Sequence, residues 1–276
     1  LIGRLFTLLP FATVAVKINF LSALMSSTTV CLMFLVTWKF LVRCLGHAPS
    51  KSEKLFIMAG AMTAAFFIAF SDSFWDNAIE AEVYSAASLV QALCVFTILR
   101  WADGRAKGKN DNLLLTIVYV MALGGMGIHL GGVLVTPGLV VFALMTNAKS
   151  LLNPRVIGLA VAAVILGTSV TLFLYIRAHL EPAINEADPR TLQALWEQLT
   201  RQQYGQGSVF YILTHRKTSW AFQFNQMFYR YTKGEFELVP EGNRLHAIGV
   251  YVPLLMALAG MVWHAGREAK SWWMQF

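Results

Sequence analysis

Four acidic side chains lie within one short segment, residues 71–84, between two long apolar runs. The chain has 15 Asp and Glu residues in all, so this segment is unusually rich in carboxylates. A carboxylate can act as a general base and take a proton from an acceptor hydroxyl. If the segment is helical from about residue 74, Asp72, Asp76 and Glu80 repeat every four residues and repel one another by a few tenths of a kcal/mol per pair. We expect this stripe to face water or a cation, and a solvated acidic loop is the simpler alternative to catalysis.

Glu82 belongs to a different face of that helix. Steps of four and three residues place it with Trp75 and Ile79 on a face that is otherwise apolar. We therefore expect its carboxylate to point into the protein at the membrane boundary, where an unpaired charge costs several kcal/mol. Glu82 could therefore have a functional role or form a structural salt bridge, and the sequence leaves both alternatives open. We expect one of three groups to be its partner: Arg4, His129 or Arg201.

Other polar side chains could complete a site near this segment. Tyr84 is by default an interfacial anchor of the aromatic belt. His129 lies among glycines that allow close approach of a ligand, although a hydrogen-bonded packing role is the alternative. Arg201, Gln203 and Tyr204 follow an amphipathic stretch, and an Arg there could hold a phosphate through two hydrogen bonds.

The composition indicates a membrane protein with several spans. Of the 276 residues, 57% are hydrophobic and only 13% are charged, whereas about a quarter are charged in soluble domains. The net charge of +7 resides in short linkers between apolar runs, as the positive-inside rule requires, so we do not expect nucleic-acid binding. The three cysteines lie in apolar runs without metal-ligand spacing, and no metal-ligand cluster is present.

Hydropathy and linker charge together predict an all-α transmembrane protein with about seven spans. The run 112–146 is too long for one crossing and is read as a hairpin whose tip, residues 124–132, lies outside near Glu82. The acidic segment also faces outward, and basic linkers mark the cytoplasmic side. The other predicted spans are residues 18–45, 55–70, 83–99, 156–176 and 246–263.

The spans divide the chain into three parts. Residues 1–177 form a transmembrane core, residues 178–245 an outer stretch, and residues 246–276 the last span with a cytoplasmic end. In the outer stretch, Asp188 with Pro189 predicts a helix start, and apolar stripes over 192–199 and 220–231 predict two surface helices. We expect these helices to leave a lipid-binding groove near His129.

Because the chain begins at Leu1 without an initiator Met, we read it as an internal fragment.

Five short pieces occur in an order that resembles one known family. That family comprises bacterial membrane proteins related to protein O-mannosyltransferases, a domain of unknown function grouped with the GT-C glycosyltransferases. Together the pieces extend over most of the first 205 residues. They are Leu1–Pro10, Lys17–Ala23, Phe74-Trp75 followed by Glu80–Tyr84, Gly127–Leu130 with Pro137 after it, and Leu199–Gly205.

The resemblance implies a GT-C-like fold in a bacterial inner membrane and transfer of a sugar, with inversion, from a polyprenyl-phosphate donor to a protein or glycan acceptor outside. It implies catalysis by acids in outer loops, for which Glu82, Asp76 and Glu80 are the candidates, and donor binding near Arg4, Tyr84 and His129. It leaves a divalent metal requirement open. In the family, an acidic outer loop precedes the piece that matches residues 3–6, and this chain starts after that loop. A non-catalytic membrane subunit or scaffold is therefore the alternative, and a transporter ranks third.

Overall fold

The computed structural model describes residues 2–108, 115, 117–118, 121, 127–183, 185, 187–200, 202, 215, 218–235 and 242–275. Within these ranges the regular secondary structure is helical, without a strand. The helices are α1 (Ile2–Thr7), α2 (Val14–Leu45), α3 (Lys51–Ala69), α4 (Asp72–Ile79), α5 (Tyr84–Ala106), the 3-10 helix η2 (Leu130–Val135), α7 (Thr136–Leu151), α8 (Pro154–Ser169), α9 (Leu172–Ala178), α10 (Leu192–Leu199), α12 (Trp220–Phe222), the π-helix η4 (Gln223–Tyr229), α13 (Arg230–Glu235), α14 (His246–Arg267) and α15 (Ala269–Trp273).

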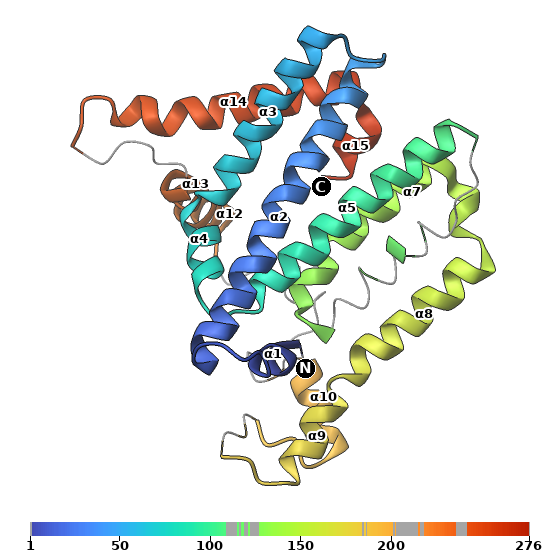
Figure 1. Ribbon diagram of the computed structural model, residues 1–276, viewed down its shortest axis with the longest axis vertical. Coiled ribbons are helices and arrows are strands. Elements are labelled where there is room, and N and C mark those ends of the chain that lie inside the picture. Colours follow the sequence, from blue (N-terminus) through green and yellow to red (C-terminus); the bar gives the residue numbers. More distant parts are fainter. Residues whose placement is uncertain are drawn as a thin grey trace.

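Four stretches of the described chain are long and apolar enough to cross a membrane: Val14–Leu45, Lys51–Ala69, Tyr84–Ala106 and Pro154–Ala178. Each coincides with a predicted span. In Figure 1, α2, α3, α5, α7 and α8 run in broadly similar directions, whereas α14 runs at a large angle to α2 and α3. The prediction of an all-helical membrane protein is thus confirmed, with four helical stretches that could span the membrane. The predicted number of seven spans stays a prediction.

The turn between α2 and α3 is capped on both sides. Gly46 ends α2 with φ of 74°, a left-handed conformation that glycine adopts without steric cost, and its N–H donates to the Arg43 carbonyl. Ser50 and Glu53 then form a reciprocal capping box at the start of α3. These caps satisfy backbone groups that a helix end leaves unpaired, so the two helices reverse direction within a short loop.

Small polar side chains line the contact between α2 and α5. Ser22, Ser26 and Thr29 are buried on one face of α2, and the Ser26 hydroxyl donates to the Ser85 hydroxyl at 3.0 Å. Between membrane helices the hydrophobic drive is weak, so small residues that allow close backbone approach and interhelical hydrogen bonds hold the pair together. Since residue 26 contacts residue 85 and residue 43 contacts residue 103, the two helices run parallel.

The apolar core lies beside this contact. Trp101, Phe142 and Ile98 are fully buried in it, and Met274 brings the end of the chain against α7. The complete cluster is Val36, Cys94, Ile98, Leu99, Trp101, Ala102, Leu115, Val118, Leu139, Phe142, Ala143, Val156 and Met274. The core therefore joins α2, α5, α7 and α8 and sets the frame that positions the segments at either end.

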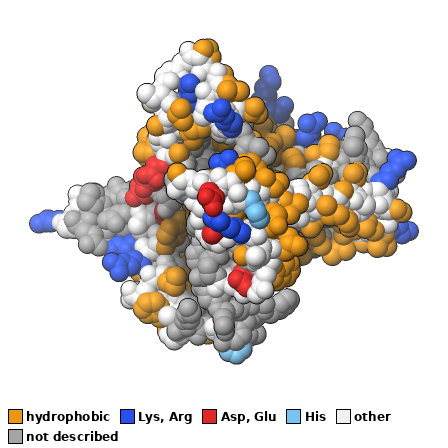
Figure 2. All heavy atoms as spheres, turned by 90° about the horizontal axis from the view of Figure 1, so that it is seen from below, with side chains coloured by type: hydrophobic (Ala, Val, Ile, Leu, Met, Phe, Trp, Pro, Cys, Tyr) orange, Lys and Arg blue, Asp and Glu red, His pale blue; other side chains and the backbone are white. Residues whose placement is uncertain are grey.

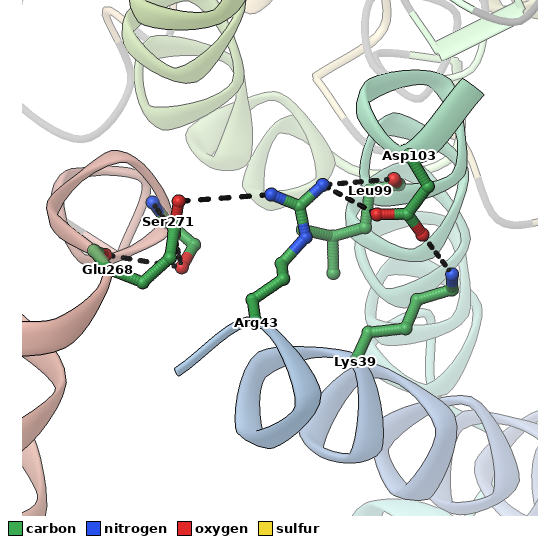
Figure 3. Close-up of polar contacts among 6 residues, drawn as sticks. All are labelled: Lys39, Arg43, Leu99, Asp103, Glu268 and Ser271. Carbon is green, nitrogen blue, oxygen red and sulfur yellow. Dashed lines mark hydrogen bonds and ion pairs between the residues drawn. The ribbon is translucent and has the colours of Figure 1, made fainter. Parts of the chain in front are cut away.

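A charged cluster fixes the end of the bundle opposite the acidic segment. Asp103 on α5 accepts from Lys39 Nζ at 2.6 Å and from Arg43 Nη2 at 2.8 Å, both on α2 (Figure 3). Arg43 Nη1 also lies 3.8 Å from a carboxylate oxygen of Glu268. The pairing of both cations with Asp103 links α2 to α5. That this end faces the cytoplasm stays a prediction from the linker charges.

Replacement of Asp103 by Asn should destabilise the bundle. It removes the charge that pairs with two partly buried cations, and the loss should lie between that of an exposed pair and that of a buried pair, roughly 1–3 kcal/mol. Thermal unfolding in detergent measures the effect. Glu181→Gln, which weakens the exposed 3.2 Å pair with Arg190, is the matched control and should change the melting temperature little. An equal shift in both variants would contradict a role for the buried cluster.

Candidate active site

The acidic segment is a short helix followed by a break. α4 ends at Ile79, Glu80 is extended with φ of −107° and ψ of 159°, and α5 begins only at Tyr84. The expectation that Glu82 shares a helical face with Trp75 and Ile79 is therefore wrong. The Glu82 side chain is exposed on the surface of the protein and is not buried in the core. The reason is the break, which ends the helical periodicity before residue 82.

Glu82 instead borders a pocket of about 540 Å³, which we call the Glu82 groove. α1, the first turns of α2, the start of α5, residues 127–128 and α8 surround it. Ile18, Leu21, Ser22 and Met25 form one face of α2 along the groove, because they are spaced by three and four residues. The remaining lining residues are mostly aliphatic or small: Ile2, Gly3, Ala81, Val83, Ala86, Gly127, Ile128, Ala163, Leu166, Gly167 and Val170. A carboxylate thus stands at the border of an apolar groove.

Tyr84 and His129 lie against each other beside this groove. Their ring centroids are 5.0 Å apart and the planes meet at 67°. His129 Nδ1 accepts the Gly131 N–H at 3.0 Å, so the ring proton of neutral His129 is on Nε2. A Cβ on residue 131 would lie 2.8 Å from Nδ1, and only glycine allows this approach. Gln91 Nε2 donates to the Gly131 carbonyl at 2.7 Å and ties the segment to α5.

The structure thus brings residues 127–129 of the glycine-rich tip next to the end of the acidic segment, as the sequence predicts. It does not bring Arg4 or His129 into contact with the Glu82 carboxylate: no hydrogen bond or ion pair joins them among the residues that can be placed. Arg4 is exposed and donates to Thr7 Oγ1 at 3.4 Å, although its neighbours Ile2 and Gly3 border the groove. Arg201, Gln203 and Tyr204 lie outside the described residues.

The other acids of the segment are also exposed. Asp72, Asp76 and Glu80 all lie on the surface, as expected, but α4 ends at Ile79, so the helical stripe expected from residue 74 onward does not extend to Glu80. Figure 2, which views the molecule from below, shows acidic side chains toward the middle of that face, basic side chains both there and at its edges, and hydrophobic side chains over much of the rest. Within the described ranges, no three His, Cys, Asp or Glu side chains are grouped in a way that could hold a metal ion.

A carboxylate distant in sequence holds α4 in place. Glu235 at the end of α13 accepts from the Ser73 backbone N–H at 3.3 Å and from the Ser73 hydroxyl. It provides the cap at the start of α4 that Ser71 does not supply. At the other end, the Asn77 carbonyl accepts from Ser85 at 2.7 Å. Sequence reasoning missed this contact because nothing local links residue 235 to residue 73.

Loss of the Glu235 carboxylate should loosen α4 and leave the spans intact. Glu235→Ala removes the cap on α4, which is worth roughly 0.5–2 kcal/mol, so amide exchange at residues 72–79 should become faster. Exchange in α2 should stay as in the wild type. The neighbouring change Lys233→Ala leaves the Ser73 contact in place and serves as the control. Amide exchange in α4 at the wild-type rate would show that the Glu235 cap does not stabilise this helix.

The first helix of residues 178–245 begins differently from the sequence prediction. α10 starts at Leu192 with Thr191 as its cap, since Thr191 Oγ1 accepts the Ala194 N–H at 3.1 Å. Asp188 is not the cap; it accepts from Arg190 Nε at 2.7 Å. That hydrogen bond holds the pKa of Asp188 below its usual value and raises the pKa of Arg190. The helix itself is confirmed over 192–199.

The two aromatic surface helices lie apart. α10 packs near α9, whereas α13 packs near α4 (Figure 1). Trp196 on α10 is exposed, and so are Trp220, Phe224 and Phe228 on α12 and η4. The expectation that these helices line a groove near His129 is therefore wrong, because the Glu82 groove is lined by α1, α2, the start of α5, residues 127–128 and α8. Their exposed aromatic faces still suit the membrane surface.

Comparison with known proteins places the chain in a family. Residues 1–152 match the model of the Protein O-mannosyl-transferase TMEM260 N-terminal domain. The chain belongs to this family. No curated protein and no solved structure matched it. The matched region includes α1, the acidic segment, Tyr84 and His129, and thus all of the Glu82 groove except its α8 side.

Proposed function

We propose that this protein is a membrane glycosyltransferase that moves a mannosyl group from a polyprenyl-phosphate donor to a hydroxyl of a protein acceptor. Membership of the O-mannosyltransferase family carries the proposal. In keeping with the resemblance seen in the sequence, we place the reaction on the outer face of a bacterial plasma membrane and expect a GT-C arrangement of the spans.

The Glu82 groove supports a lipid-linked donor. Its lining is apolar, and it is formed by spans that a bilayer surrounds, so an isoprenoid chain could enter from the membrane. A polar head must then stay at the border of the groove, where Glu82 and Tyr84 are exposed. The groove thus suits a molecule with a long apolar tail and a polar reactive head.

Glu82 is the residue to which we assign proton transfer. Its carboxylate is exposed at the mouth of the groove and makes no ion pair with a described residue, so it is open to accept a proton from an acceptor hydroxyl. Asp76 and Glu80 are further candidates on the same segment. Sugar transfer also needs donors that steady the departing phosphate. We assign this role to three groups: the Nε2–H of His129 and the guanidinium groups of Arg4 and Arg201. Gln203 and Tyr204 are further residues that we expect to bind the sugar donor.

Transfer of labelled mannose tests the proposal. Purified full-length protein in lipid is mixed with mannosyl-polyprenyl phosphate and a Ser/Thr-containing acceptor peptide, and label on the peptide is measured with and without added divalent cation. Labelled peptide in either arm supports the enzyme. Absence of label in both arms, with donor binding retained, would favour the non-catalytic subunit.

A further inference from the structure

A second pocket lies at the opposite end of the bundle from the Glu82 groove. It measures about 410 Å³ and is formed where α2, α5 and α7 end and where α15 packs against α7. Arg43, Asp103, Arg105, Thr146, Glu268 and Lys270 border it, together with Ala102 and Ala106. An adjoining pocket of about 360 Å³ shares Arg43, Asp103 and Ala106 and adds Lys39 and Lys107. We call the two together the basic pocket.

The carboxylates of the basic pocket are already engaged. Asp103 pairs with Lys39 and Arg43 (Figure 3). Glu268 accepts the Ser271 N–H at 2.7 Å and lies 3.8 Å from Arg43. Five cationic side chains therefore face two carboxylates: Lys39, Arg43, Arg105, Lys107 and Lys270. Lys107 and Lys270 are exposed and add positive charge beyond the pairs that Asp103 and Glu268 form, and this charge favours an anion.

Two buried polar atoms in the same place lack a hydrogen-bond partner among the described residues. Arg43 Nε and Thr146 Oγ1 are shielded from solvent and make no hydrogen bond within the part of the chain that the structure describes. A buried donor without an acceptor costs roughly 1–3 kcal/mol. Both atoms can donate, so an acceptor bound beside them would recover that cost. The positive charge and the two buried hydrogen-bond donors together favour binding of an anion that has several acceptor oxygens.

The position of the basic pocket identifies the class of anion. Arg43 lies in the last turn of α2 and Arg105 in the last turn of α5, at the ends of two helices that can span a membrane. Lipid phosphates lie at this depth, and basic pockets between spans are suited to them. We propose that the basic pocket binds the phosphate group of an anionic lipid headgroup at the end of the bundle where α2 and α5 terminate.

Lipid binding to the purified full-length protein tests this assignment. Native mass spectrometry compares phosphatidylglycerol with phosphatidylcholine, and a separate titration uses glycerol 3-phosphate as the free phosphate. We expect phosphatidylglycerol to bind in preference to phosphatidylcholine. Binding of glycerol 3-phosphate with equal affinity would assign the site to a soluble phosphate, which keeps the phosphate chemistry and overturns the lipid source.

Matched variants separate the basic pocket from general surface charge. The double change Lys107→Ala and Lys270→Ala should weaken phosphatidylglycerol binding by roughly 10-fold to 30-fold. Lys51→Ala with Lys54→Ala removes the same charge from exposed positions on α3 and should change affinity less than twofold. Thr146→Val, which keeps the side-chain shape, should weaken binding by about threefold. Equal losses in the two double variants, or no lipid preference in the wild type, would overturn the proposal.

Discussion

Glu82→Gln should lower mannosyl transfer by at least about 100-fold, the usual share of a general base, while expression and melting temperature stay close to wild type. The amide keeps the size of the side chain but cannot take a proton. Because Glu82 is exposed and makes no ion pair with a described residue, its loss leaves no partner unpaired. The measurement is the initial rate of label transfer at saturating donor, together with thermal unfolding in the same lipid.

Glu80→Gln tests the other candidate base nearest to Glu82 on the same segment. Glu80 is also exposed, lies two residues away, and does not border the Glu82 groove, so its variant should retain most of the activity. Full activity in Glu82→Gln would remove this residue from the site. A reversed result, with loss of activity only in Glu80→Gln, would assign the general base to Glu80 in place of Glu82.

The sequence predicted the parts of this fold that depend on local pattern. Long apolar runs gave the four spans, because a helix must satisfy its own backbone in lipid. Linker charges placed Lys39 and Arg43 together at one end. The stripe at 192–199 predicted α10, although its cap is Thr191, which can accept the N–H three residues on. In each case, the residues that carry the sequence pattern are the same residues that form the predicted element, or lie within a few residues of it.

The arrangement of the site depended on contacts that have no local signal. The break after Ile79 ended the periodicity on which the orientation of Glu82 was predicted. No strong helix breaker occupies residues 80–83. Glu235 caps α4 from another part of the chain, and Asp103 pairs with two residues of α2. Such pairs become visible only once the helices are packed, because side chains far apart in sequence must first be brought together.

Filling the Glu82 groove should block donor binding without removing any polar group. Ala86 is half-buried, lies on the first turn of α5 and borders the groove. A phenylalanine ring at this position would occupy space that the apolar tail of the donor needs. Because overpacking costs roughly 1–3 kcal/mol, Ala86→Phe should weaken binding of polyprenyl phosphate by about 10-fold to 100-fold and raise the donor KM accordingly.

The same substitution at Ala59 separates this effect from a general response to an added ring. Ala59 is exposed on α3 and does not border the groove, so Ala59→Phe should bind donor as the wild type does. Donor affinity is measured by competition between unlabelled polyprenyl phosphate and a labelled analogue, and a water-soluble mannosyl phosphate without the tail is tested in parallel. Ala86→Phe should leave its binding unchanged, since the head at the mouth of the groove is not displaced. Wild-type affinity of Ala86→Phe for the long-chain donor would show that the tail lies elsewhere, and equal loss for both molecules would mean that the ring has distorted the mouth around Glu82.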